Sequence, residues 1–204
     1  MILTKYFLSR SIVKVKSEND FSCMGKIKNS IIKLYGCRNE IVIGKGANLR
    51  GCRIFIHGVN NKLIIGDECD LQNTSIFMDN NDGRITIGDK TSIGRSMLVS
   101  FEEYPVSIGR ECMISYDVEI RNTDSHAIYS SKTHERVNLG RPVVISDRVW
   151  IGCGSMVLKG SKVGMNSIIG AKSIVSGKIP DSCVAVGNPA KPIKNDVCWE
   201  RELF

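Results

Sequence analysis

The sequence has few aromatic residues and no long apolar run. Phenylalanine, tryptophan and tyrosine make up 6% of the 204 residues, which does not suit a core packed on aromatic rings. No apolar stretch approaches the roughly 18 residues that a membrane-spanning helix needs. Lys5, Arg10 and Lys14 interrupt the start of the chain, which makes it a poor secretory signal. We therefore expect a cytoplasmic protein with at most peripheral membrane contact.

The usual cysteine patterns are also missing. The eight cysteines form no Cys-x-x-Cys pair and no Cys/His array with the spacing of a zinc site. Cys69 and Cys112 fall at a small-residue position of the repeat described below. We expect buried, reduced thiols in a reducing compartment and no bound metal.

Positive charge is in excess and is concentrated near the start. Lysine and arginine number 28 against 21 aspartates and glutamates, a formal net charge of +7. Residues 1–40 hold eight of the bases and three of the acids, a local net of +5. Aromatic residues are not interleaved with these bases as single-strand nucleic-acid binding requires, so we expect no nucleic-acid partner. The excess fits either a solubilising end or loose attraction to an anionic polymer or membrane surface.

What the sequence does contain is a strict six-residue period. A branched apolar residue recurs between residues 145 and 175 without a slip, at Ile145, Ile151, Val157, Val163, Ile169 and Val175. Neither a helix of 3.6 residues per turn nor the alternation of a single strand has this period. It is typical of a parallel β-helix built from hexapeptides, with one branched side chain pointing inward on each face.

A longer period precedes this stretch. Ile-Gly pairs begin at Ile43, Ile65, Ile87 and Ile108, with spacings of 22, 22 and 21 residues. Three hexapeptides need only 18 residues, so each coil carries three or four extra. We expect the extra residues at 57–62, 79–83 and 101–105, stacked above one another at one corner. The first two of these segments are rich in asparagine, aspartate and glycine, which favour turns.

The six-residue step reaches His126 and then fails until Ile145. We interpret 127–144 as an excursion loop, and a long irregular loop in a regular solenoid is more often functional than accidental. The β-helix is expected over 41–194, after a basic lead-in of strands in 1–40, although residues 1–24 fit a strand or a short helix. A tail of residues 195–204 is expected to form a short helix that covers the open end.

The C-terminal third carries further motifs in a specific order and spacing. They are Val149-Trp150-Ile151-Gly152, Ile169-Gly170-Ala171-Lys172-Ser173-Ile174-Val175, Ile179-Pro180 and Gly187-Asn188-Pro189-Ala190-Lys191. Over about residues 41–194 the sequence resembles the hexapeptide-repeat O-acetyltransferases, most of all those that acetylate sugars and surface polysaccharides. The resemblance implies a left-handed β-helix and a homotrimer with active sites between subunits. It also implies acetyl-coenzyme A as donor and a saccharide hydroxyl as acceptor.

The catalytic histidine of that family lies on an excursion loop before the Trp-Ile-Gly motif, and His126 matches it. Moving an acetyl group from a thioester to a hydroxyl needs a base near neutral pH, which histidine supplies. Asp124 and Asn122 are expected to orient the ring or bind the substrate. A Ser/His/Asp acyl-enzyme would call for a Gly-x-Ser-x-Gly elbow, which is absent, so we favour direct transfer.

The resemblance also implies where coenzyme A binds. Its pantetheine arm is expected along a corner of the last coils, at Trp150, Cys153, Ala171, Ser176 and Gly177. Trp150 serves there either as a wall for the thioester end or in packing. Gly177 stands where the family commonly has a lysine, and Lys178 follows it, so the side-chain contact of the family is not carried over to this position. Two basic residues match those near the nucleotide phosphates: Lys191 and Lys194.

Three alternatives stay open at this point. N-acetylation of an amino sugar uses the same solenoid. A zinc hydratase of the γ-carbonic anhydrase type needs three converging histidines, and the sequence has only His57, His126 and His134. A non-enzymatic solenoid would show no irregular break, so the interruption after His126 speaks against it.

Overall fold

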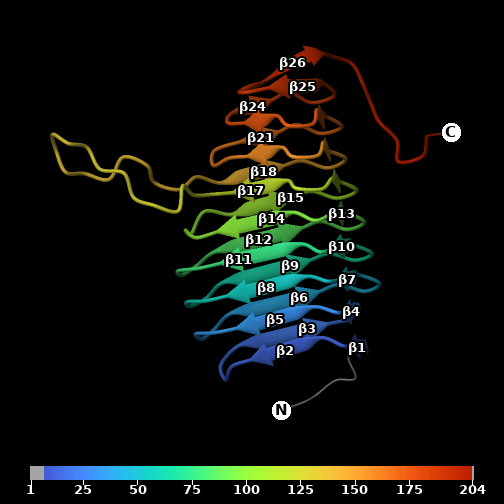
Figure 1. Ribbon diagram of the computed structural model, residues 1–204, viewed down its shortest axis with the longest axis vertical. Coiled ribbons are helices and arrows are strands. Elements are labelled where there is room, and N and C mark those ends of the chain that lie inside the picture. Colours follow the sequence, from blue (N-terminus) through green and yellow to red (C-terminus); the bar gives the residue numbers. More distant parts are fainter. Residues whose placement is uncertain (1–6, 204) are drawn as a thin grey trace.

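The chain winds into a three-sided prism whose faces are parallel β-sheets (Figure 1). The computed structural model describes residues 7–203, and in this part of the chain it contains strands and no helix. Accordingly, these residues offer no helix that would span a membrane. Successive strands go to successive faces, so a strand pairs with the one three places further along the chain. The predicted all-β parallel β-helix is confirmed.

We call the three sheets A, B and C, and we name each corner by the two sheets that its turns join. Sheet A contains β1 (Phe7–Ser9), β4 (Lys26–Lys28), β7 (Asn48–Arg50), β10 (Asp70–Gln72), β13 (Ser92–Ile93), β16 (Met113–Ile114), β19 (Trp150–Ile151), β22 (Ile168–Ile169), β25 (Val184–Gly187) and β26 (Ala190–Lys194). Sheet B contains β2 (Ile12–Val15), β5 (Ile31–Leu34), β8 (Arg53–Ile56), β11 (Ser75–Met78), β14 (Met97–Ser100), β17 (Glu119–Arg121), β20 (Met156–Val157) and β23 (Ile174–Val175). Sheet C contains β3 (Asp20–Cys23), β6 (Glu40–Ile43), β9 (Lys62–Ile65), β12 (Arg84–Ile87), β15 (Val106–Ile108), β18 (Val143–Ile145), β21 (Lys162–Val163) and β24 (Lys178–Ile179).

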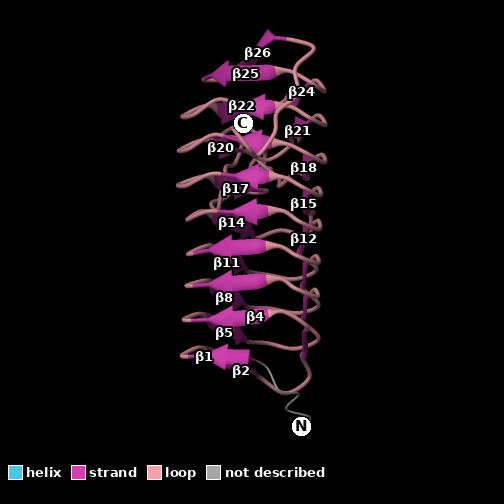
Figure 2. Ribbon diagram, turned by 90° about the vertical axis from the view of Figure 1, so that its right-hand side faces the viewer, coloured by secondary structure: helices cyan, strands magenta, loops and turns pink. Residues whose placement is uncertain are grey.

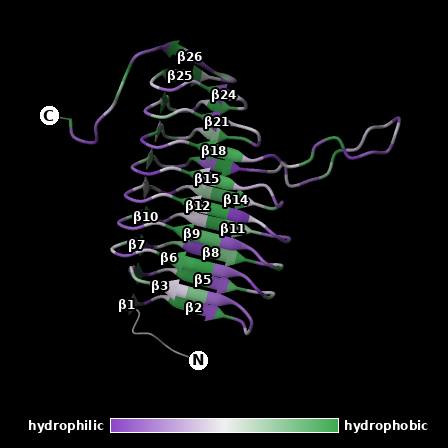
Figure 3. Cartoon of the chain, turned by 180° about the vertical axis from the view of Figure 1, so that it is seen from behind, coloured by the Kyte–Doolittle hydropathy of each residue, from purple (hydrophilic) through white to green (hydrophobic). Residues whose placement is uncertain are grey.

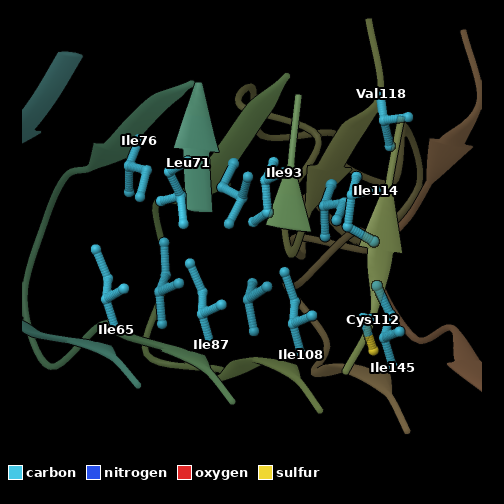
Figure 4. Close-up of a cluster of buried hydrophobic side chains, with 14 of the residues drawn as sticks. Ile65, Leu71, Ile76, Ile87, Ile93, Ile108, Cys112, Ile114, Val118 and Ile145 are labelled. Atoms are coloured by element: carbon cyan, nitrogen blue, oxygen red, sulfur yellow. The ribbon is translucent and has the colours of Figure 1, made fainter. Parts of the chain in front are cut away.

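The repeated apolar residues form columns inside the prism. In sheet C, Ile43, Ile65, Ile87, Ile108 and Ile145 lie in register on successive strands. Their exposed fractions are 2% or less, and Figure 4 shows four of them in a row facing the apolar residues of the other sheets. Because the six-residue step returns each branched side chain to the inside of the next face, the two periods seen in the sequence are one packing pattern.

The extra residues of the lower coils stack at the B–C corner, as predicted. Asn61, which is fully buried, ties two of these turns together: its side-chain amide donates to His57 O at 2.8 Å and to Asn80 O at 2.9 Å, and its oxygen accepts from Gly83 N at 2.8 Å. Since an unpaired buried carbonyl is costly, asparagine suits the inside of such a turn. Hydrophilic residues gather in these turns (Figure 3).

The predicted C-terminal helix is wrong. From β26 the chain descends along the outside of the prism in an extended course (Figures 1 and 2). The end of the solenoid is covered instead by β26, which folds back antiparallel on β25. A helix this short is marginal by itself, whereas the extended tail gains partners at the C–A corner, among them Ser182 O, which accepts from Val197 N at 3.0 Å.

The lead-in of residues 1–40 is described from residue 7 onward. Its strands β1 to β5 lie in the same three sheets as the rest of the chain. The prediction for residues 1–6 lies outside the described residues.

Candidate active site

The excursion loop leaves the prism at the B–C corner, where the lower coils have their extra residues (Figure 1). It lies between β17, which ends at Arg121, and β18, which begins at Val143. The loop therefore covers 122–142 rather than the predicted 127–144. Val143 already belongs to β18, where it is fully buried and pairs with Val106. Side chains alternate along a strand, so Val143 points to the same inner face as Ile145 two residues later.

Glu102, from the turn one coil below, holds the base of the loop. Its carboxylate accepts from Arg136 Nη2 at 2.7 Å, from Gly140 N at 2.9 Å and from Thr123 Oγ1 at 3.0 Å. Burial raises the pKa of Glu102, but these hydrogen bonds and the charge of Arg136 outweigh it, so the pKa lies below its ordinary value. One carboxylate thus joins the outgoing and returning halves of the loop.

Asn138 fixes the main chain at His126 and just after it. It is 8% exposed. Its side-chain amide donates to His126 O at 2.8 Å, and its oxygen accepts from Ile128 N at 2.7 Å. The side chain of His126 is exposed, and within residues 7–203 its imidazole makes no hydrogen bond or ion pair. The ring is therefore held by its backbone and open to a substrate.

Asp124 acts on this arrangement through Asn138 and Lys159. Of its two predicted roles, orienting the ring through a direct hydrogen bond is not observed, and binding the substrate stays a prediction. Its carboxylate accepts from Asn138 Nδ2 at 2.8 Å and from Lys159 Nζ at 2.6 Å. The hydrogen bond from Lys159 is the main reason that the pKa of Asp124 is lowered. Lys159 also donates to Asn138 O at 3.0 Å and Leu139 O at 3.1 Å, so it holds the returning half of the loop as well.

Asn122 likewise has a different place from the one predicted. Its side chain is fully buried and donates to Tyr104 O at 2.6 Å and Glu102 O at 3.0 Å. It closes the turn below the loop and reaches neither the imidazole nor the surface. Sequence reasoning missed Glu102, Asn138 and Lys159, because they lie outside the family motif and meet only when the coils stack.

Part of the predicted donor site lies at the A–B corner. Cys153 and Ala171 are exposed there on neighbouring coils, which are linked by Lys172 N donating to Cys153 O at 2.8 Å. Trp150 lies on the outer face of β19, in sheet A, and is 36% exposed. Gly152 serves the stacking of the coils, since a Cβ there would lie 2.6 Å from Ala171 N.

The other predicted donor residues lie elsewhere. Ser176 and Gly177 are exposed at the B–C corner, in the turn from β23 to β24. Lys191 and Lys194 are exposed on β26 at the end of the solenoid. Within one chain, Trp150 therefore lies on sheet A, the face opposite the B–C corner that carries His126.

The three histidines do not converge. His57 packs in a lower turn with its ring centroid 4.8 Å from that of Tyr35, and His134 lies exposed in the loop. Over the described part of the chain, no group of three or more His, Cys, Asp or Glu side chains is placed to hold a metal ion.

Sequence comparison links the chain to known proteins. Residues 142–177 match the family model described as bacterial transferase hexapeptide (six repeats). The chain is 34% identical over 115 residues to a polysialic acid O-acetyltransferase of Neisseria meningitidis, covering 56% of this chain and 54% of that protein. It is 35% identical over 111 residues to a polysialic acid O-acetyltransferase of Escherichia coli O1:K1 / APEC, covering 54% of this chain and 36% of that protein. The alignments thus span about half or less of these relatives.

Two solved structures match the chain over nearly its whole length. The polysialic acid O-acetyltransferase OatWY superposes with a TM-score of 0.85 at 27% identity, covering 98% of this chain and 93% of that one. The polySia-specific acetyltransferase NeuO superposes with a TM-score of 0.68 at 29% identity, covering 97% and 90%.

Proposed function

We propose that this chain transfers an acetyl group from acetyl-coenzyme A to a hydroxyl of a saccharide. The chain belongs to the hexapeptide-repeat acetyltransferases with a left-handed β-helix. The observation that carries the proposal is the imidazole of His126, which is solvent-facing on a backbone held by Asn138. The names of its relatives support a capsular polysaccharide or exopolysaccharide, or a precursor, as the acceptor.

The reaction is a direct transfer. His126 accepts the proton of the acceptor hydroxyl while that oxygen attacks the thioester carbonyl carbon. The new C–O bond forms, the C–S bond breaks, and the leaving sulfur takes the proton back from the imidazolium. A general base placed in this way contributes a factor of roughly 10²–10⁴ to the rate.

We further propose a homotrimer with an active site between neighbouring subunits. Its support is the separation of the two half-sites: His126 belongs to the B–C corner, whereas Trp150 lies on sheet A and Cys153 and Ala171 at the A–B corner of the same prism. If the threefold axis is parallel to the axis of the solenoid, equivalent residues of the three subunits lie at the same level along that axis. The loop of one copy then meets the A–B corner of the next near Tyr116, which is 64% exposed and lies in the coil from which the loop departs.

The excursion loop has an apolar face suited to such a contact. Ile128 and Val137 lie opposite each other, with Val137 N donating to Ile128 O at 2.9 Å, and they are 54% and 62% exposed. Apolar groups this exposed gain roughly 25 cal/mol for each Å² that a partner covers.

A reducing, cytoplasmic location is part of the proposal. All eight cysteines are free thiols. Burial raises the pKa of Cys52, Cys69 and Cys112 to about 11, which keeps these thiols protonated and unreactive.

The test measures thiol release from acetyl-coenzyme A with and without saccharide acceptors, beginning with sialic acid polymers and galactosides. We expect release only with an acceptor, and a loss of at least about a hundredfold in His126→Ala. His134→Ala, in the same loop, is the matched control and should keep its activity.

The product separates O-acetylation from N-acetylation, because hydroxylamine cleaves an ester and leaves an amide. An amide product would replace the hydroxyl acceptor by an amino sugar. Near-normal activity of His126→Ala would remove this residue from the mechanism, and absence of coenzyme A binding by calorimetry would overturn the whole proposal.

A further inference from the structure

The extended tail, residues 195–203, brings the two tryptophans of the sequence together. The ring centroids of Trp150 and Trp199 are 6.1 Å apart and their planes are tilted by 50°. Such a tilted arrangement at this distance is a favourable aromatic contact. Trp199 is 8% exposed and Trp150 is 36% exposed, so the tail covers one side of Trp150 and leaves another open.

Trp199 is held by the solenoid independently of Trp150. Its indole Nε1 donates to Arg148 O at 2.7 Å. In return, the guanidinium of Arg148 donates to Trp199 O at 3.2 Å and to Glu200 Oε1 at 3.0 Å. Further along the tail, Arg201 donates to Cys112 O at 2.8 Å. The tail is thus fastened to the C–A corner by main-chain acceptors, which makes Trp199 a fixed surface for its neighbour.

No strong polar contact fixes the ring of Trp150. It projects from the outer face of β19 between the paired residues Met113 and Ile168, and its Nε1 reaches Ser115 Oγ only at 3.5 Å, the outer limit of a hydrogen bond. A side chain on an outer sheet face exchanges between staggered rotamers unless its neighbours exclude some of them. Trp199 is such a neighbour, and it packs against the ring of Trp150 from the tail.

We propose that Trp199 is a positioning residue of the donor site, which holds the indole of Trp150 in the orientation that receives the thioester end of acetyl-coenzyme A. This inference rests on the proposed function. The inference also gives the extended tail a role in the donor site. A helix covering the last coil, as predicted from the sequence, would not bring Trp199 beside Trp150.

The test is binding of coenzyme A to the full-length protein by calorimetry. Trp199→Ala should weaken binding about threefold to tenfold, the factor expected when one side chain must be immobilised on binding. Trp199→Phe keeps an aromatic ring against Trp150 and should recover most of the affinity. Glu200→Gln, on the next residue of the tail, removes an exposed ion pair and should bind like wild type.

A second pair of variants separates positioning from a general loss of stability. In a Trp150→Phe background, Trp199→Ala should cause little further loss of affinity, because its effect passes through Trp150. The two indoles should also give a coupled near-ultraviolet circular dichroism signal without ligand, which either single substitution abolishes.

Two results would overturn the inference: unchanged coenzyme A affinity in Trp199→Ala, or an equal loss in the wild-type and Trp150→Phe backgrounds. Wild-type protein that binds no coenzyme A would instead refute the proposed function, and the dichroism signal would still report the contact between the indoles.

Discussion

The side-chain amide of Asn138 donates to the main-chain oxygen of His126 at 2.8 Å, so a residue on the returning half of the loop holds the candidate base on the outgoing half. The same amide group donates to Asp124, which Lys159 also binds. The position of the imidazole thus depends on residues that never touch the ring.

Replacing Asn138 should therefore impair transfer without removing the base. We expect Asn138→Ala to lower kcat/KM about tenfold to a hundredfold, because small misplacements of catalytic groups are costly. Thr133→Ala, at an exposed site in the same loop, should have no such effect. Steady-state kinetics of both variants checks this, and equal rates would show that the loop holds His126 without Asn138.

Acid should loosen the loop through Glu102. The pKa of Glu102 is lowered on folding from its ordinary value of 4.5, so its contribution to stability is complete well above that pH and is lost as the pH falls through the folded pKa. We expect protease sensitivity of the loop to rise below about pH 4.5.

In Glu102→Gln the loop should be sensitive already at pH 7, since hydrogen bonds to a charged group contribute about 1.5–3 kcal/mol each. The pH dependence of that variant should be flatter than that of wild type. Identical profiles for the two proteins would rule out Glu102 as the clamp.

Charge on the apolar face of the loop should weaken the proposed trimer. Val137→Glu places a carboxylate where we propose that a neighbouring subunit packs, and an uncompensated buried charge is strongly unfavourable. Sedimentation velocity should show smaller species for Val137→Glu and an unchanged assembly for Lys132→Glu, an exposed control in the same loop. Unaltered sedimentation of Val137→Glu would move the interface away from this face.

The inward columns should tolerate loss of volume poorly. Ile87 is fully buried, whereas Thr86 on the same strand faces outward. We expect Ile87→Ala to cost about 2–5 kcal/mol and Thr86→Ala under about 0.5 kcal/mol, both measured by chemical denaturation. Similar costs at the two positions would contradict the inward assignment of this strand.

Much of the fold was predictable because, in a solenoid, the spacing of residues along the sequence determines which side chains are buried. A branched residue at every sixth position predicted which side chains line the core. The break after His126 predicted that a loop leaves the prism before Ile145, although the loop begins at residue 122, after β17. The end of the tail was not predictable in this way. The short helix expected for residues 195–204 rested on local sequence, whereas the extended course is decided by partners on distant coils, such as Arg148 O for Trp199.

The sequence by itself determined the β-helix, its interior and the loop that carries His126, because these depend on contacts that repeat at a regular spacing along the chain. Only the tertiary structure decided what surrounds the candidate base. Glu102, Asn138 and Lys159 come from different coils, and the stacking of coils of unequal length brings their side chains to one corner. The same stacking places Trp150 on sheet A, away from that corner, because the face to which a residue belongs depends on the length of every turn before it.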